Sequence, residues 1–494
     1  MFDRLNLSRN LMKEEGIIFS QIDEKEQLNL RMLKNEIFKE ENFINTIAIK
    51  SSTPSGTKTA HKNKTIIKTK DYINVYKKNN DIELEPQYVS REKWDNHYSL
   101  YLEKINGEYT FFKLIDKLAE AGYQYNKLED INPQDESIRK FIVENQEKII
   151  RLQSHKNKEL DLISREQYPD KVYEHIVDNE LRGLYFNGQV VTQIKQGIKE
   201  IIVNKKLKPY WSILLCDFWN DLDFQNTQNE GIVSFPNGKK PEALIYRLIN
   251  LSNNPQIVMD YFAGSGTTPA VAHKLNKNYI AIEMGEYFDK LTLKRMKYTL
   301  FGNSGGITSQ KNGGMFKYFR LESYEDCLNN LAVKNTDVGL FDDNVKEDYL
   351  LNYMLDYETN ESLLNIDAFK TPFDYKLKIA TSSAGETVET NVDLVETFNY
   401  LIGLKVKTRV MNKGFLVIQG ENLKEEKILI IWRNGQSNDE LNSFFEKMDW
   451  TVYDREFATI YVNGDNNLAN LKKDEEHFKV KLIEEEFKAR MFGE

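Results

Sequence analysis

The sequence predicts an α/β protein built on a doubly wound sheet, and three observations lead to this expectation. Residues 257–260 form a short apolar segment that runs into a glycine turn at Gly264 and Gly266, and a helix is expected directly after the turn. A second apolar segment, residues 279–282, follows that helix and ends in Glu283. The order of strand, loop, helix and strand is typical of parallel sheets in doubly wound proteins.

The N-terminal part of the chain shows a similar alternation of elements. A predicted helix opens the chain and ends at Gly16, and residues 17–22 are expected to form a buried strand. Asp23 is expected to cap the next helix, with Glu26 completing a capping box. Residues 72–76 predict another short strand.

The rest of the chain predicts β structure in several places. Residues 181–188 suggest a turn-rich β region, and residues 313–321 suggest a strand after a glycine-containing loop. Beyond about residue 331 we expect a separate α/β unit. Its predicted strands are residues 414–419, 427–432 and 458–462.

Composition narrows the possible classes of protein. The chain has 494 residues and a formal net charge of −9. Its two cysteines, Cys216 and Cys327, lie far apart and suit a reducing cytoplasm, and its six histidines form no metal-binding motif. No apolar run approaches the roughly 20 residues that cross a membrane, and the N-terminus lacks the pattern of a secretory signal. The sequence therefore predicts a cytoplasmic protein without a metal site.

The glycine turn has the features of a nucleotide-like ligand site. Gly264 and Gly266 permit close approach of the backbone to a ligand, and the helix after them presents backbone N–H groups. Asp260 lies where the strand meets the loop, and Glu283 ends the next strand, where a carboxylate accepts both hydroxyls of a ribose. NAD is the alternative ligand, but the turn lacks the third glycine of a dinucleotide site.

These residues carry a resemblance to a known family. The run from Asp260 through Phe262, Gly264 and Gly266 to two threonines resembles the S-adenosylmethionine loop, or motif I, of amino-group DNA methyltransferases. The resemblance implies a Rossmann-like methyltransferase sheet and S-adenosyl-L-methionine as cofactor. It further implies that the cofactor contacts Asp260, Phe262, Ala263, Gly264, Ser265, Gly266, Thr267 and Glu283.

A second segment, residues 235–245, resembles motif X of the same enzymes. It departs from the motif because Gly238 and Lys239 stand where a proline usually lies. The resemblance implies that Lys240 faces the carboxylate end of the methionine part of the cofactor. Without it, Pro241 would simply open a helix and Lys240 would be solvated.

The order of these motifs resembles the β class of amino-methyltransferases, and in particular the modification (Mod) subunits of type III restriction–modification systems. The resemblance implies methylation of adenine N6 in double-stranded DNA, with cytosine N4 as the alternative, and further implies a homodimer and a restriction (Res) subunit as partner. We expect four parts. They are a post-catalytic methyltransferase half (1–79), an inserted target-recognition region (80–208), a cofactor half (209–330) and a C-terminal α/β domain (331–494).

A basic segment lies where such enzymes bring a loop towards DNA. Residues 42–70 contain no acidic residue, although the chain as a whole is acidic. The candidate phosphate contacts in this segment are Lys50, Lys58, Lys62, Lys64 and Lys68. The alternative is a solvated loop, because runs of charge are usually just solvated.

The catalytic Asp-Pro-Pro-Tyr motif of the family occurs nowhere in the sequence, so the catalytic residues are unknown. Its strand lies in the middle of the family's sheet, between the strand at residues 17–22 and the one that ends at Asp260. We therefore expect an incomplete sheet that lacks its central strand, in a truncated or split enzyme that is inactive alone or completed by an upstream N-terminal fragment. The alternatives are a non-catalytic remnant that binds DNA or cofactor, and a smaller sheet whose strands close up.

Overall fold

The chain forms two compact units, residues 1–316 and 317–494, each of mixed α/β structure. The computed structural model describes residues 1–321, Asp326 and 369–492 apart from short gaps. The gaps are 55–58, 61, 80–81, 155, 204–205, 225, 236–237, 303–304, 308–312, 381–385, 452, 454–455 and 471–478. The expected boundary at 330/331 lies outside the described residues, and the division into four parts stays a prediction.

The first sheet of the N-terminal unit has the strand order β1-β3-β2-β13. The pairs β1–β3 and β3–β2 are antiparallel, whereas β2 and β13 are parallel. The bounds are β1 (Ile17–Ile22), β2 (Phe43–Lys50), β3 (Lys70–Lys77) and β13 (Phe218–Trp219). The strands predicted at 17–22 and 72–76 are thus confirmed.

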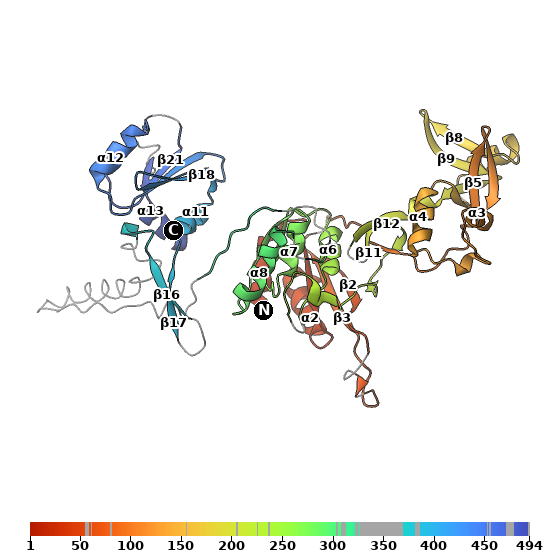
Figure 1. The fold of residues 1–494 in the computed structure, drawn as a ribbon, viewed down its shortest axis with the longest axis horizontal. Coiled ribbons are helices and arrows are strands. Elements are labelled where there is room, and N and C mark those ends of the chain that lie inside the picture. Colours follow the sequence, from red (N-terminus) through yellow and green to blue (C-terminus); the bar gives the residue numbers. More distant parts are fainter. Residues whose placement is uncertain are drawn as a thin grey trace, which may run out of the picture. The chain divides into compact units, whose positions relative to one another are not determined.

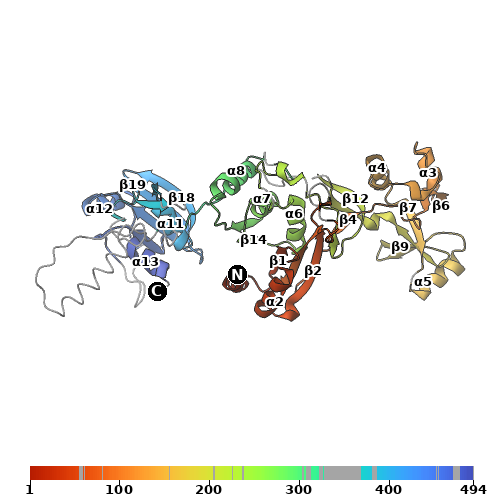
Figure 2. The ribbon, with the colours of Figure 1, turned by 90° about the horizontal axis from the view of Figure 1, so that it is seen from below.

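Helices cover both faces of this sheet because successive side chains of a strand point to opposite faces. On one face, Tyr76 packs with Leu5 of α1 (Phe2–Leu11) and with Phe38 of α2 (Gln27–Phe38). On the other face, Val75 packs with Leu244 of α6 (Glu242–Leu251). Figure 2 shows α2 beside the long strands β1 and β2.

The capping box expected at the start of α2 is wrong. Asp23 accepts hydrogen bonds from the backbone N of Lys25 and Glu26, at 3.1 and 3.4 Å, but the helix begins only at Gln27. The Asp23 carboxylate therefore closes a turn that precedes the helix. Glu26 is itself the residue before the first helical position, and its carboxylate accepts a hydrogen bond from Asn29 instead.

A separate two-stranded parallel sheet carries the glycine turn. It consists of β14 (Ile257–Asp260) and β15 (Asn278–Ala281), with α7 (Thr267–Lys274) between them and α8 (Leu293–Leu300) after them. Helices α6, α7 and α8 gather beside this sheet (Figure 2). Among the described strands, β14 pairs only with β15 and β1 pairs only with β3. Ile257 of β14 is 55% exposed, which is unusual for an apolar residue of a parallel sheet.

A largely antiparallel region is inserted between β3 and β13. Its six-stranded sheet has the order β6-β5-β7-β10-β9-β8, and a three-stranded sheet has the order β11-β12-β4. The strands are β4 (Tyr88–Ser90), β5 (Leu100–Ile105), β6 (Glu108–Lys113), β7 (Ile149–Gln153), β8 (Tyr173–Val177), β9 (Glu180–Phe186), β10 (Gln189–Gln193), β11 (Ile198–Val203) and β12 (Lys206–Leu214). The helices are α3 (Leu114–Glu120), α4 (Glu136–Glu144) and α5 (Lys158–Leu162). The β region predicted at 181–188 is confirmed.

The two ends of this inserted region lie side by side. Strand β4, near its start, pairs with β12, near its end, so that Ser90 lies opposite Ser212. The backbone N of Leu215 also donates to the carbonyl of Gln87 at 2.8 Å. The inserted region thus leaves the first sheet and returns to it through adjacent strands.

The C-terminal unit has a five-stranded sheet of order β18-β19-β20-β21-β22 and a hairpin of β16 and β17. Helices α11 and α13 cover one face of the sheet, and α12 covers the other (Figure 1). The strands are β16 (Lys376–Ala380), β17 (Thr387–Asn391), β18 (Lys405–Asn412), β19 (Phe415–Glu421), β20 (Lys427–Trp432), β21 (Thr459–Val462) and β22 (Val480–Leu482). The helices are α11 (Leu394–Leu401), α12 (Asn438–Lys447) and α13 (Ile483–Phe492).

The sequence predicted three of the strands of this unit and missed β16, β17, β18 and β22. The strands predicted at 414–419, 427–432 and 458–462 correspond to β19, β20 and β21. The strand predicted at 313–321 is wrong, because these residues form no ladder with any described strand. The prediction rested on the apolar residues of this segment, and these residues alone do not provide a neighbouring strand to pair with. In the described part of the chain, no helix is long and apolar enough to span a membrane.

Candidate functional site

Asp260 is the last residue of β14 and lies opposite Ala281 of β15. Its carboxylate Oδ1 accepts a hydrogen bond from the backbone N of Phe262 at 3.0 Å, and its carbonyl accepts one from Ile282 N at 2.9 Å. The strand end therefore turns sharply into the loop. The carboxylate stays at the carboxyl edge of the parallel pair, where ligands bind in α/β sheets.

The glycine turn adopts a conformation that needs glycine at two positions. Gly264 has φ +52° and Gly266 has φ +73°, in the left-handed region that side chains disfavour. A Cβ on Gly266 would also lie 3.0 Å from the Thr292 side chain, whereas a Cβ on Gly264 would meet nothing nearer than 3.8 Å. Helix α7 begins at the next residue, Thr267, so its free N–H groups face the turn. The expected strand, turn and helix are confirmed.

Glu283 lies two residues beyond the end of β15 and binds the glycine turn directly. Its Oε2 accepts a hydrogen bond from Gly264 N at 2.7 Å, and its Oε1 accepts one from Gly285 N at 2.8 Å. Burial raises the pKa of Glu283, but these backbone donors and the Tyr287 hydroxyl outweigh burial and lower the pKa below its usual value. The carboxylate is therefore charged and fixed beside the loop.

Aromatic rings flank this carboxylate and the loop. Phe235 and Tyr287 lie with ring centroids 5.1 Å apart, and the Phe235 ring lies 3.8 Å from the position that a Cβ on Gly264 would take. Phe262 is half exposed, and the guanidinium of Arg4 lies 5.5 Å from its ring centroid. Sequence reasoning did not assign Tyr287 to the site. Its position four residues after Glu283 is the only signal that would have suggested it.

The two lysines of the segment 238–241 lie in different surroundings. Lys239 is buried and donates to the carbonyls of Glu230 and Val233, so it supports the loop. Lys240 is half-buried, and burial lowers its pKa although Asp71 opposes that effect. The carbonyl of Lys240 accepts a hydrogen bond from the Thr267 hydroxyl at 3.4 Å, which places this segment against the start of α7. Residues 236 and 237 lie outside the described part.

The candidate DNA-contacting lysines also differ from one another. Lys50, at the end of β2, is exposed, and so are Lys62 and Lys64. Lys68 forms ion pairs with Asp23 at 3.2 Å and with Asp71 at 3.7 Å. Its charge is thus already compensated. Lys58 lies outside the described residues.

Residues 218–221, which precede the segment 238–241, tie the first sheet to α6. Trp219 of β13 is buried, and the Arg247 guanidinium of α6 lies 5.0 Å from its ring centroid. The same guanidinium forms a bidentate pair with Asp221, at 3.0 and 2.6 Å. These contacts anchor α6, and with it the segment that carries Lys240, to the first sheet.

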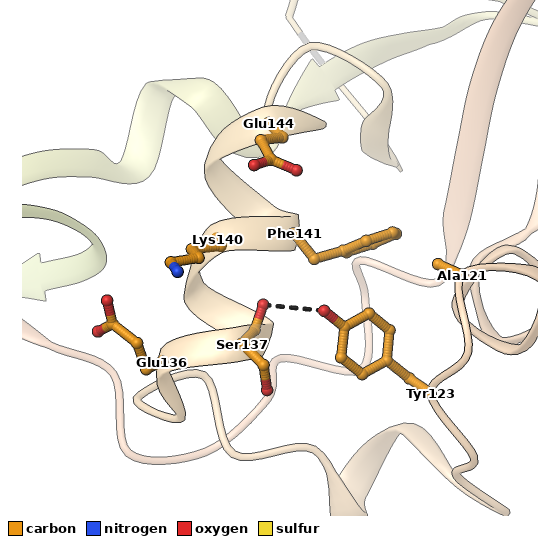
Figure 3. Close-up of a pocket in the computed structure, with 7 residues that line it drawn as sticks. All are labelled: Ala121, Tyr123, Glu136, Ser137, Lys140, Phe141 and Glu144. Carbon is orange, nitrogen blue, oxygen red and sulfur yellow. Dashed lines mark hydrogen bonds between the residues drawn. The ribbon is translucent and has the colours of Figure 1, made fainter.

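A cavity elsewhere in the chain is unrelated to this chemistry. It is open, has a volume of about 720 Å³ and lies on α4 of the inserted region. Figure 3 shows Tyr123 donating to the carbonyl of Ser137 beside it, with Phe141 packed near the Tyr123 ring. Glu136, one of the lining residues, is paired with Arg139 and Lys208. In the described part, no group of three or more His, Cys, Asp or Glu side chains is placed to hold a metal ion.

The donor set around the glycine turn fits S-adenosylmethionine. Two carboxylates at adjacent strand ends, Asp260 and Glu283, suit a cationic ligand that carries a ribose diol. The Phe235 and Tyr287 rings offer apolar faces for a purine, and Lys240 offers a cation for a carboxylate.

The chain belongs to the DNA methylase family, whose model matches residues 1–294. It is 28% identical, over 410 residues, to the probable type III restriction–modification enzyme HindVI Mod subunit of Haemophilus influenzae, covering 76% of this chain and 54% of that protein. It is 26% identical, over 318 residues, to the EcoPI Mod subunit of Escherichia phage P1, covering 59% of this chain and 45% of that protein.

A shorter match links the chain to an adenine-specific enzyme. The DNA adenine methyltransferase YhdJ of Escherichia coli is 36% identical over 94 residues, which are 18% of this chain and 32% of that enzyme. The chain thus spans about half the length, or less, of these relatives. The family match confirms the resemblance that was drawn from the glycine turn and from the order of the motifs along the chain.

Proposed function

We propose that the chain binds S-adenosyl-L-methionine at the turn formed by residues 260–267 and serves adenine-N6 methylation of DNA. The observation that carries this proposal is the hydrogen bond from Gly264 N to Glu283, which holds a charged carboxylate beside a helix N-terminus. In the proposed complex Glu283 accepts the ribose hydroxyls and Asp260 lies near the sulfonium. Lys240 pairs with the methionine carboxylate, and Phe235 with Tyr287 contacts the adenine.

The bound cofactor would supply an activated methyl group, and the protein's task is to position it. Adenine N6 is a weak nucleophile, so the base must be flipped out and its amino hydrogens accepted by hydrogen-bonding groups. The lone pair can then be held in line with the methyl group. The chain lacks the Asp-Pro-Pro-Tyr motif that serves this role in the family, so its catalytic residues stay unassigned.

We further propose that the two parallel strands β14 and β15 and the first sheet are parts of one doubly wound, Rossmann-like sheet. Support comes from β1 and β14, each of which has one paired neighbour among the described strands. Side chains link the two parts, because Lys13 donates to Gln256 at 3.0 Å and Tyr261 donates to Ser8 at 3.4 Å. The strand between them would come from a polypeptide that carries Asp-Pro-Pro-Tyr, such as an upstream fragment.

The proposed macromolecular partners follow from the relatives' names and from surface charge. Two relatives are Mod subunits of type III restriction–modification enzymes, so we propose double-stranded DNA as substrate and a Res subunit as partner. A homodimer is proposed from the family resemblance alone. The exposed Lys50, Lys62 and Lys64 are proposed to contact DNA phosphates. The inserted region is proposed to recognise the target sequence.

A non-catalytic remnant is the second candidate, and the missing Asp-Pro-Pro-Tyr motif favours it. Such a protein would bind cofactor or DNA without transferring a methyl group. Cytosine N4 is the alternative acceptor within the methyltransferase proposal. The two acceptor bases are distinguished by their products, because N6-methyladenine and N4-methylcytosine are distinct nucleosides. The remnant would give neither product.

Two measurements test these proposals. Calorimetric titration of the full chain should give binding of S-adenosylmethionine and not of NAD, and the reverse result would refute the cofactor assignment. Transfer of a labelled methyl group to DNA should then be measured with and without an added polypeptide that carries Asp-Pro-Pro-Tyr. Methylation only with the added polypeptide supports a completed enzyme. Cofactor binding without methylation in both reactions supports the remnant.

A further inference from the structure

A buried network of charges lies behind the glycine turn and centres on Glu242, the first residue of α6. Glu242 is fully buried, and its Oε1 accepts a hydrogen bond from Arg295 of α8 at 2.8 Å. Its Oε2 accepts hydrogen bonds from Lys274, the last residue of α7, at 2.7 Å and from the backbone N of Ile307 at 3.0 Å. One carboxylate therefore joins three elements.

Only one of the two cations bound by Glu242 reaches the glycine turn. Arg295 Nη1 donates to the Thr267 hydroxyl at 2.8 Å, and lies 3.4 Å from the Ser265 hydroxyl. Lys274 instead donates to the carbonyl of Gly305, away from the turn. Arg295 holds the carboxylate with Nη2 and the turn with Nη1, two nitrogens of one planar group, whereas a lysine at this position would have a single nitrogen for both.

The backbone packs tightly against this network, so that two nearby glycines have no room for a side chain. A Cβ on Gly231 would lie 2.4 Å from Arg295 Nε, and a Cβ on Gly306 would lie 2.0 Å from Glu242 Oε2. Arg295 has no solvent exposure. Burying a guanidinium and a carboxylate costs solvation free energy, and the pair often contributes little net stability over apolar side chains of equal volume. A role in positioning accounts for such a pair better than stability does.

We propose that Arg295, held in place by Glu242, is a positioning residue that fixes the Ser265–Thr267 turn for the cofactor. The inference rests on the proposed function, because it concerns how the same site binds S-adenosylmethionine. Arg295 does not touch the cofactor in this account. It orients the Thr267 hydroxyl and the start of α7, and so presets the backbone N–H groups that the ligand meets.

The test compares variants of the full chain. Arg295→Lys keeps a cation for Glu242 but cannot also reach Thr267, and Thr267→Val removes the contacted hydroxyl at nearly constant volume. Lys274→Met is the matched control, because it breaks a bond to the same carboxylate without touching the turn. Three quantities are measured for each variant. They are the Kd for S-adenosylmethionine, the thermal midpoint, and the rate of amide hydrogen exchange at residues 264–268.

Arg295→Lys should weaken cofactor binding about tenfold, the size expected for one lost charge-assisted hydrogen bond. It should also accelerate exchange at the turn. Lys274→Met should lower the thermal midpoint and leave the Kd within about twofold. In a Thr267→Val background, Arg295→Lys should lose most of its effect on Kd, which is the signature of coupling between the two residues.

Equal effects of Arg295→Lys in both backgrounds would overturn the proposal, as would equal changes in Kd for Arg295→Lys and Lys274→Met. If the variants at 295 do not fold, Thr267→Val alone decides, since it leaves the ion pair intact and should still accelerate exchange at the turn. If the unaltered chain does not bind S-adenosylmethionine, the proposed function fails. The exchange measurements then still show whether Arg295 fixes the turn.

Discussion

Glu283 Oε2 lies 2.7 Å from the backbone N of Gly264, so the acid that follows β15 is bonded to the turn that follows β14. The two residues are 19 positions apart in the chain, and the bond holds them at one edge of the parallel pair. A carboxylate that already accepts backbone hydrogen bonds needs little rearrangement to receive a ligand. The site is therefore largely formed before any ligand arrives.

Replacing Glu283 should weaken cofactor binding more than it weakens the fold. Glu283→Gln removes the charge and sets an amide donor against either Gly264 N or Gly285 N, so one backbone donor loses its acceptor. We expect the Kd for S-adenosylmethionine, measured by calorimetry, to rise about tenfold to a hundredfold. Glu286→Gln, an exposed neighbour, is the control and should leave the Kd unchanged. Similar Kd values for both variants would contradict the assigned role.

The two glycines of the turn should respond differently to alanine. Both have positive φ, which costs an alanine about 1 kcal/mol or slightly more. Gly266→Ala additionally presses a Cβ against Thr292 at 3.0 Å, whereas Gly264→Ala makes only ordinary van der Waals contacts, at 3.8 Å or more. Gly266→Ala should therefore lower the free energy of unfolding further than Gly264→Ala in urea titrations. An equal loss of unfolding free energy in both variants would mean that the Thr292 side chain moves aside without destabilising the fold.

The stability of the N-terminal unit should rise with pH above neutrality because of Lys34. Lys34 lies on the buried face of α2 and is fully buried. Its Nζ donates to the Ser20 hydroxyl at 2.9 Å, and burial lowers its pKa to about 7. The unfolded chain has an ordinary lysine pKa near about 10.4. Between pH 7 and about 10.4 the unfolded state thus binds more protons.

In that range Lys34 should add up to about 1.4 kcal/mol of stability per pH unit, and the contribution should be flat below pH 7. The free energy of unfolding of the full chain and of Lys34→Met is measured in urea at pH 7 and pH 9. The comparison isolates the effect of Lys34, since all other groups titrate in both proteins. Lys34→Met should have the shallower slope. Lys25→Met, at an exposed position, should keep the original slope. Parallel slopes in all three proteins would rule out a neutral Lys34.

Each exposed lysine of the basic segment (residues 42–70) that contacts a DNA phosphate should add to the salt dependence of DNA binding. Replacing Lys62 and Lys64 together by alanine should reduce the slope of log K against log salt by about 2, because each lost contact removes about 0.9. Fluorescence anisotropy with a duplex at several salt concentrations measures this slope. Lys447→Ala on α12 is the control, and its slope should match that of the unaltered chain. An unchanged slope in the double variant would mean that Lys62 and Lys64 are solvated and do not contact DNA phosphates.

The sequence predicted the strand, glycine turn and helix at 257–274 because their signals are local. The apolar strand before Asp260, the two glycines and the helix start all lie within a dozen positions, and each has a direct steric reason. The family match over residues 1–294 agrees with that interpretation. Strands β19, β20 and β21 were found for the same reason, since short apolar runs between turn residues are strong local patterns. Strands β16, β17, β18 and β22 were missed.

Features that depend on distant partners were missed or misjudged. Arg295 joins Glu242, 53 positions away, and no local pattern marks an arginine that will be buried. The strand predicted at 313–321 lacked a partner among the described strands, and the ion pairs of Lys68 with Asp23 and Asp71 were not foreseen. Pairing and burial are properties of the folded chain, so a single sequence without contacts could not supply them.

The pairing of β4 with β12 has a consequence for how such proteins diversify. Because Ser90 lies opposite Ser212, both ends of the inserted region are already neighbours before any exchange takes place. A stretch of gene that encodes everything between these two strands can be replaced as one cassette, with its junctions meeting on the same ladder. The host sheet and the cofactor turn would be left as they are. If the inserted region recognises the target, as proposed, a single recombination event changes the target preference and leaves the glycine turn intact.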